Sequence, residues 1–137
     1  MSQENVEVVR RFIEALPRAQ ASGDWQPVLA EVDPAVEIED LDISLDTECY
    51  RGHESVRRWI GVWMESWESW TLEEVQVRPV GEDRAIGLFL VRARGKGSGI
   101  ELSRHDAAVC KLRAGKIEEV TYYNDQQQAL EAVGRSD

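Results

Sequence analysis

The sequence has few cysteines and no long apolar run. Cys49 and Cys110 are its two cysteines among 137 residues, and their separation fits no metal-binding motif. Because no stretch of 18 apolar residues occurs, we expect no transmembrane helix. The first residues are charged and helix-like rather than apolar. This start argues against a signal peptide and favours a cytoplasmic protein without a structural disulfide.

Basic residues are also scarce. The chain has 16 Lys and Arg against 26 Asp and Glu, which gives a formal net charge of −10. Nucleic acids are bound without sequence preference through clustered Lys and Arg, and anionic membranes attract proteins in the same way. We therefore expect neither nucleic acid nor a membrane as a partner.

Cofactor motifs are missing from the sequence. It has no Gly-rich phosphate loop, no nucleophile elbow and no dinucleotide fingerprint. The Gly-rich segment 95–99 lies between two predicted strands and is typical of a hairpin turn. His53 and His105 have no carboxylate partners at metal-ligand spacing, so neither a metal centre nor a cofactor is predicted.

The apolar residues that are present predict helices first and strands later. The length suits one domain, residues 1–137, with a single core. The first predicted helix extends from Val6 to Leu16, and Pro17 ends or kinks it; a short second one after Gly23 reaches Val32 and ends at Asp33-Pro34. A third helix follows Gly52, with an apolar face that reaches Trp67. A terminal helix is capped by Asp125. The predicted strands are 35–40, 71–80, 84–94, 100–112 and 117–124, with a polar loop at 41–51. This order indicates an α+β fold, with helices on one face of a curved antiparallel sheet.

Alternation along the last two strands predicts which side chains face the core. Neighbouring residues of a strand point to opposite faces of the sheet. If Leu112 and Val120 face inward, the same face carries Leu102, Arg104, Asp106, Ala108, Cys110, Tyr122 and Asn124. The opposite face then carries His105, Ala107, Val109 and Tyr123.

Three segments together resemble the SnoaL-like, polyketide cyclase-like branch of the NTF2-like superfamily. They are the opening helix 4–12, the segment 50–56 (Tyr-Arg-Gly-His-Glu-Ser-Val), and the hairpin 113–117 with the run 122–126 (Tyr-Tyr-Asn-Asp-Gln) and the helix at 129–134. The resemblance covers nearly the whole chain. It implies an NTF2-like cone with a pocket between the curved sheet and the N-terminal helices. It also implies a homodimer through the outward face of the last strands, where Ala107, Val109 and Tyr123 form an apolar stripe.

Asp40 is the first candidate for catalysis. The string from Val36 to Asp40 resembles the strand of ketosteroid isomerases that ends in the general-base aspartate. Burial beside the third predicted helix would raise the pKa of this carboxyl and suit it to proton abstraction next to a carbonyl. The alternative is an ordinary acid at a strand end. The isomerase tyrosine corresponds to Phe12 and the second isomerase acid falls near Ala108, so the donors for an oxyanion are missing. The acid–base pair of the polyketide cyclases is missing too, because its positions fall at Ala108 and Tyr122.

Asp106 is the second candidate. It would face inward beside Arg104 on the same strand, where an acid and a guanidinium could fix a polar ligand or form a structural ion pair. The ligand itself is expected in a pocket lined by Phe12, Trp59, Trp63, Arg104, Tyr122 and Asn124. A flat, hydrophobic molecule would suit such walls, although the same aromatic residues could simply form the core.

Three functions therefore remain open. The first is a SnoaL-like domain that binds a small, mostly apolar molecule. The second is a cofactor-independent isomerase, cyclase-type lyase or hydrolase that uses Asp40 or Asp106 as acid or base. The third is a non-catalytic dimerisation module. A pocket acid with a strongly raised pKa would favour the enzyme, and a cavity filled by tryptophans would favour the module.

Overall fold

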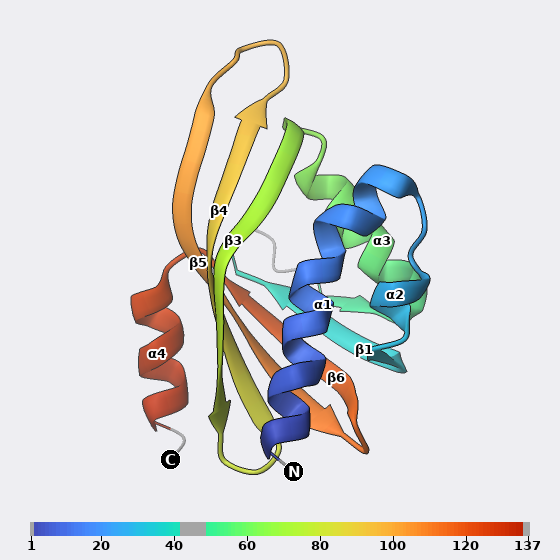
Figure 1. Cartoon of the computed structure of the whole chain (residues 1–137), viewed down its shortest axis with the longest axis vertical. Coiled ribbons are helices and arrows are strands. Elements are labelled where there is room, and N and C mark those ends of the chain that lie inside the picture. The colour runs from blue at the N-terminus through green and yellow to red at the C-terminus, as the bar shows by residue number, and fades with distance from the viewer. Residues whose placement is uncertain (1, 42–48, 136–137) are drawn as a thin grey trace.

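The chain folds into one sheet with helices on both faces (Figure 1). The computed structural model describes residues 2–41 and 49–135. The helices are α1 (Ser2–Ser22), α2 (Gln26–Leu29), α3 (His53–Trp63) and α4 (Gln126–Arg135). The strands are β1 (Val32–Asp40), β2 (Cys49–Arg51), β3 (Trp67–Val80), β4 (Arg84–Gly95), β5 (Glu101–Arg113) and β6 (Lys116–Tyr123). The predicted α+β class, with a curved sheet packed against N-terminal helices, is confirmed.

The six strands of the described residues follow the order β2-β1-β6-β5-β4-β3, so β2 and β3 are open edges. All neighbours are antiparallel except β1 and β6, which run parallel. This pair corrects the prediction of an antiparallel sheet. Hairpins force antiparallel pairing, but β1 and β6 are separated along the chain by α3 and four strands, so their direction is free. β2 was not predicted, because its three residues lie in what we expected to be a polar loop.

The main core lies between α1, α2, α3 and the inner face of the sheet. α1 packs mainly on β3 and β4, whereas α3 packs on β1 and β2 (Figure 1). The apolar stripe of α1 that the spacing predicted is buried: Val9, Phe12, Ile13 and Leu16 are at most 4% exposed. Each such side chain stabilises the fold by about 1.5–3 kcal/mol relative to an exposed one. The two helices thus cover different halves of the sheet.

Gly87 on β4 lets α1 approach the sheet closely. A Cβ atom built at this position would stand 2.3 Å from Cδ1 of Ile13. That separation is far below a van der Waals contact, so any side chain at position 87 must displace Ile13, which is only 1% exposed. The missing side chain therefore sets the distance between α1 and the middle of the sheet.

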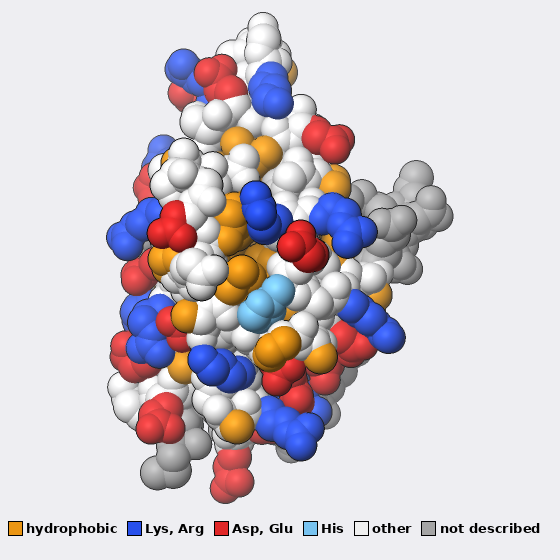
Figure 2. All heavy atoms as spheres, turned by 90° about the vertical axis from the view of Figure 1, so that its right-hand side faces the viewer, with side chains coloured by type: hydrophobic (Ala, Val, Ile, Leu, Met, Phe, Trp, Pro, Cys, Tyr) orange, Lys and Arg blue, Asp and Glu red, His pale blue; other side chains and the backbone are white. Residues whose placement is uncertain are grey.

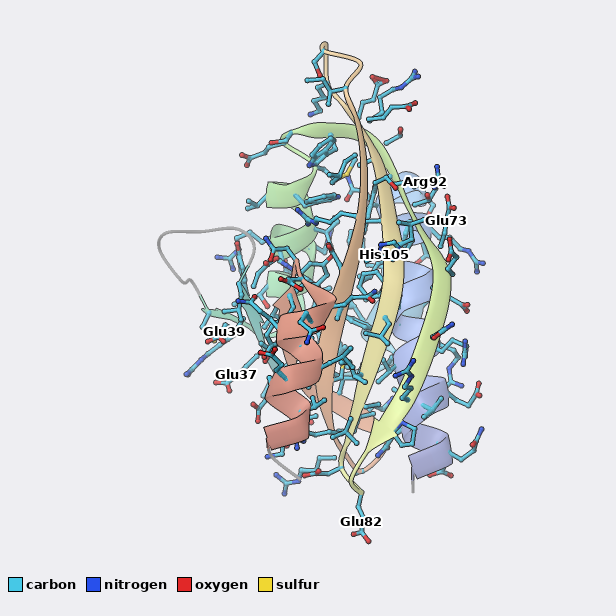
Figure 3. The ribbon with its side chains drawn as sticks, turned by 90° about the vertical axis from the view of Figure 1, so that its left-hand side faces the viewer. Glu37, Glu39, Glu73, Glu82, Arg92 and His105 are labelled. Atoms are coloured by element: carbon cyan, nitrogen blue, oxygen red, sulfur yellow. The ribbon has the colours of Figure 1, made fainter. Side chains whose placement is uncertain are left out.

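The predicted alternation along β5 and β6 is confirmed. Ala108, Cys110 and Val120 belong to the main core, whereas Ala107, Val109 and Tyr123 belong to a second apolar cluster on the outer face. His105 lies on that outer face, as do Glu73 and Arg92 (Figure 3).

The outer apolar stripe is covered in part by the chain itself. Ala129 and Val133 of α4 belong to one apolar cluster with Ala107, which is fully buried, whereas Val109 and Tyr123 are only partly buried. This cover reduces the apolar surface that the stripe alone would offer to a second chain. The homodimer stays a prediction, and light scattering at tens of micromolar measures it.

Two predicted boundaries are wrong, and one of the two alternatives at Pro17 is excluded. α1 does not end at Pro17 but continues to Ser22, because the buried Ala19 extends its apolar stripe beyond the proline. The segment from Val32 to Pro34 is strand rather than helix end, and Pro34 lies where the β1–β6 register shifts, so the ladder does not need its N–H. α3 ends at Trp63, and Trp67 instead begins β3.

Within the described ranges, no helix is both long and apolar enough to cross a membrane.

The close approach at Gly87 gives the first prediction. Gly87→Ala should lower the free energy of unfolding by about 1–3 kcal/mol, because the new Cβ overpacks against Ile13. Ile13→Val removes the clashing Cδ1 atom and should cost about 1 kcal/mol alone. The double variant should be no less stable than Ile13→Val, which urea unfolding will show. Purely additive losses would contradict the packing argument.

Candidate functional site

A narrow cavity lies between α1, α3 and the inner face of the sheet. Its walls are almost entirely apolar, with Asp40 and Tyr122 as the polar exceptions apart from indole N–H groups. It is lined by Phe12, Ile13, Leu16, Asp40, Trp59, Ile60, Trp63, Trp70, Leu72, Phe89, Ala108 and Tyr122. Its position follows from the fold, because α1 and α3 cover different halves of the sheet and leave a seam between them.

The cavity has a volume of about 30 Å³. One water molecule needs roughly 10–15 Å³ on this measure, whereas pockets for drug-sized ligands span about 300–1,000 Å³. The free space therefore holds about two water molecules. A ligand with an aromatic ring would need a wall of the cavity to move outward.

The polar side of the cavity is set by strand register. Asp40 on β1 pairs directly with Tyr122 on β6. Tyr122 in turn pairs with Ala108 on β5, and Ala108 pairs with Gly87 on β4. All four therefore lie in one row across the inner face. Side chains in this row are small or absent near α1, at Gly87 and Ala108, and large or polar near α3, at Tyr122 and Asp40.

Asp40 is held by α3. The Asp40 residue is 6% exposed, and the indole Nε1–H of Trp59 donates to its Oδ2 at 2.6 Å. Trp59 also meets the ring of Tyr122 edge-on, with ring centroids 5.7 Å apart. The carboxylate that the sequence singled out thus lies in the cavity wall, where the hydrogen bond from Trp59 orients it.

Asp106 lies in a separate network beside the cavity. It is fully buried and accepts two hydrogen bonds from Arg104, Nε to Oδ1 at 2.6 Å and a terminal nitrogen to Oδ2 at 2.9 Å. The Tyr122 hydroxyl donates a third, to Oδ2 at 2.5 Å. Both carboxylate oxygens are occupied, which is the condition for a buried charge to be tolerated. Asp106 is therefore built as a structural anchor rather than as an acid or base that reaches a ligand.

Tyr122 is locked in its protonated form. Burial, and next the neighbouring Asp106 carboxylate, raise the pKa of the Tyr122 hydroxyl well above its ordinary value of 10.0. The hydroxyl proton is also committed to Asp106. Tyr122 can therefore present its ring to a ligand, but its single donor is already used.

Gln126 supports the Asp106 network from the outer face. Its side-chain amide donates to the backbone oxygens of Asp106 at 2.9 Å and of Phe89 at 3.3 Å. Gln126 begins α4, after Asp125, whose carboxylate accepts from the N–H of Gln127 at 2.8 Å. The predicted capping role of Asp125 is confirmed, but the sequence carried no signal for the contact of Gln126.

Three tryptophans form a cluster where α3 ends and β3 begins. Trp63 stacks on Trp67 at 5.4 Å between ring centroids and meets Trp70 edge-on at 6.1 Å. Nε1 of Trp63 and Nε1 of Trp70 are the buried side-chain polar atoms, among the described residues, that have no hydrogen-bond partner. Each such donor costs about 1–3 kcal/mol, so two of them in one cavity wall require an explanation.

The structure places most of the predicted site residues together. Phe12, Trp59, Trp63, Tyr122 and Asp40 line the cavity, and Arg104 and Asp106 lie directly behind Tyr122. Asn124 follows the end of β6 and is exposed, away from the lining residues. Sequence reasoning did not place Trp70 in the site. The predicted strand began at residue 71, so Trp70 lay outside it, whereas β3 begins at Trp67 and carries Trp70 on its inner face.

Apart from Asp40, the lining of the cavity contains no Asp, Glu, Lys or Arg side chain among the described residues. On the face that carries α2 and α3, hydrophobic side chains gather in the middle, between acidic and basic ones (Figure 2). In the part of the chain that the structure describes, no group of three or more His, Cys, Asp or Glu side chains could hold a metal ion. The cavity wall offers recognition by shape, ring contacts and few hydrogen bonds.

Comparison with known proteins identifies the fold. No protein-family model matches the chain, and no curated protein matches it in sequence. An NTF2-like protein from Burkholderia xenovorans LB400 has a TM-score of 0.72 at 20% identity, covering 97% of this chain and 98% of that chain. A candidate SnoaL-like polyketide cyclase from Jannaschia sp. CCS1 has a TM-score of 0.70 at 19% identity, with coverages of 96% and 92%. TerC, co-crystallised with polyporic acid, has a TM-score of 0.74 at 15% identity, with coverages of 96% and 98%.

At these identities the likeness defines the fold. The chain has the SnoaL-like, NTF2-like architecture that its three sequence segments predicted, along nearly its whole length.

The Asp106 network gives a stability prediction. Asp106→Asn should lower the free energy of unfolding by about 2–3 kcal/mol, because it leaves Arg104 and Tyr122 without a full acceptor. The loss is smaller than for a fully buried pair, since the Arg104 side chain is 27% exposed. Glu73→Gln breaks the exposed pair with Arg92 on the same sheet and should change stability by at most about 0.5 kcal/mol. Equal effects of the two changes in urea unfolding would contradict the assignment.

The raised pKa of Tyr122 gives a pH prediction. The folded chain keeps this proton at a pH where the unfolded chain releases it, so Tyr122 makes stability fall as the pH rises above about 10. Tyr122→Phe should remove that part of the fall. In the folded protein, phenolate absorbance up to about pH 11 should be the same for wild type and variant. A variant that loses one titrating group near pH 10 would show that Tyr122 is not shielded.

Proposed function

We propose that the chain binds a small, mostly apolar molecule in the cavity between α1, α3 and the sheet. The observation that carries the proposal is the composition of the walls. Apolar and aromatic side chains from α1, α3 and four strands converge there on a single buried carboxylate, Asp40. Such a surface recognises a flat ring system through burial and ring contacts, and a polar substituent through Asp40.

One solved structure of this fold supports the class of ligand. TerC was co-crystallised with polyporic acid. The likeness to TerC extends to the fold, so polyporic acid is a probe for this chain and its natural ligand is a separate question.

Binding requires the cavity to open. Trp63 and Trp70 are only half-buried, and they come from different elements, the end of α3 and the start of β3. Outward movement of the end of α3 and the start of β3, with these rings still packed on one another, would enlarge the cavity without moving the buried floor at Ala108 and Phe89. The ligand would then replace contacts between the tryptophans and the opposite wall of the cavity on α1.

The test uses two alanines on β5 that differ only in the face they occupy. Ala108→Leu adds three carbon atoms to the cavity floor, whereas Ala107→Leu adds the same atoms beneath α4. Both changes overpack a buried position and should cost about 1–3 kcal/mol of stability. We expect polyporic acid to quench the tryptophan fluorescence of the wild type. Ala108→Leu should weaken this binding at least about tenfold, while Ala107→Leu should leave it within about twofold.

Native mass spectrometry of the freshly purified protein is the complementary measurement. A co-purified small molecule that is lost in Ala108→Leu and kept in Ala107→Leu would support the proposal. Failure to bind polyporic acid, together with no co-purified molecule, would contradict it, as would equal binding by the two variants.

An enzyme is the second candidate, and Asp40 favours it. A carboxylate in an apolar wall, oriented by Trp59, could take a proton from a carbon next to a ligand carbonyl and return it at another carbon. Such an isomerisation balances without a co-reactant. Asp106 is the weaker choice, because Arg104 and Tyr122 occupy both its oxygens.

Asp40→Asn tests the enzyme directly. The variant keeps the shape and an acceptor for Trp59 but removes the base, so it should lower turnover of an identified substrate by at least about a hundredfold and leave binding nearly unchanged. Glu39→Gln is the matched control, because Glu39 is the exposed neighbour on the opposite side of the same strand (Figure 3). Full turnover in Asp40→Asn would leave the binding function and remove the enzyme.

A further inference from the structure

We infer that Trp63 and Trp70 determine ligand specificity, by donating their indole N–H groups to neutral acceptor oxygens of a ligand. The inference rests on the proposed binding function and adds to it the chemistry of the ligand at one end of the cavity. It assigns a recognition role to two residues of the tryptophan cluster, beyond that of a hydrophobic wall.

The three tryptophans that line the cavity differ in one respect. The N–H of Trp59 donates to Asp40, whereas those of Trp63 and Trp70 are shielded from solvent and have no acceptor among the described residues. Buried indole N–H groups normally find a partner. If these positions served packing alone, phenylalanine or leucine would fill them without burying an unpaired donor.

The donors are also held in place. The ring of Trp63 is stacked on Trp67, meets Trp70 edge-on, and has the guanidinium carbon of Arg104 6.0 Å from its centroid. Contacts on several sides fix the direction of an N–H group before a ligand arrives. A donor oriented in this way loses little entropy on binding, which is how a site gains selectivity from a hydrogen bond.

The surrounding charges restrict the acceptor to a neutral one. The guanidinium of Arg104 is committed to Asp106, so this pair offers no net positive charge to the cavity. Asp40 is the carboxylate in the wall, so a charged acceptor group is disfavoured beside it when it is ionised, and a neutral acceptor is favoured. A carbonyl oxygen of a ketone, quinone, ester or amide satisfies both conditions, because it accepts hydrogen bonds and carries no charge.

The experiment compares two probes of the same ring shape. 1-Indanone carries one carbonyl oxygen, and indane carries none. Each hydrogen bond between neutral groups corresponds to about a fivefold change in affinity, so wild type should bind 1-indanone at least about fivefold more tightly than indane. This ratio should fall in Trp63→Phe and in Trp70→Phe and approach one in the double variant. Trp25→Phe, a buried change in the same core but outside the cavity lining, should keep the wild-type ratio.

A second readout needs no variant that binds. In ¹⁵N-labelled wild type, the indole N–H resonances of Trp63 and Trp70 should move downfield on addition of 1-indanone and not on addition of indane. The Phe variants serve only to assign the two signals, which can be done on folded apo protein.

The outcomes separate the two proposals. If neither probe binds at millimolar concentration and polyporic acid also fails, the binding function and this inference both fall. If both probes bind with equal affinity, or if 1-indanone binds without moving the two indole signals, the cavity binds ligands but the tryptophans do not select them. A carbonyl preference that survives in the double variant would also overturn the inference.

Discussion

The contact between Ile13 and Gly87 sets the geometry on which the rest of the structure depends. With no side chain at position 87, α1 lies close to β4, and the row of residues across the sheet then grows in size toward α3. α3 rests on the other half of the sheet, above Asp40 and Tyr122, so the two helices leave a strip of the inner face between them uncovered. The seam between them becomes the cavity. Its apolar floor and its polar side are consequences of one strand register.

The two buried carboxylates near this seam illustrate how local partners decide what a group can do. Asp106 is surrounded by donors on its own sheet and contributes to the fold, whereas Asp40 accepts from Trp59 of α3 and lines the cavity. Both are acids at inward positions of strands that flank β6, so composition and alternation cannot tell them apart. Their difference comes from Arg104, which is close enough to cover one carboxylate from two directions.

Much of the fold could be predicted from the sequence because its signals are local. The stripe from Val9 to Leu16, the turn at 81–83 and the alternation along β5 depend only on residues a few positions apart. The errors arose where distant packing overrides local preference. Helix α1 continues through Pro17 because Ala19 is buried against the core. Trp67 and Trp70 have helical spacing after Trp63, but they pair with β4 as part of strand β3. The candidate site followed the same rule. Alternation brought Tyr122, Asp106 and Arg104 to one face, but only three-dimensional contacts reveal which hydrogen bonds are already made.

The side chain of Gln126 reaches from α4 to the backbone oxygens of Phe89 and Asp106, and so ties the terminal helix to the strands that carry the site. Those two residues are partners across β4 and β5, with side chains directed to the opposite, inner face. The last helix is therefore not an appendage that covers apolar surface and can be trimmed. A shortened chain that ended after β6 would lose the two hydrogen bonds from Gln126 to the backbone of β4 and β5. A new segment joined after β6 in place of α4 would therefore change the support of the strands that form the floor of the cavity.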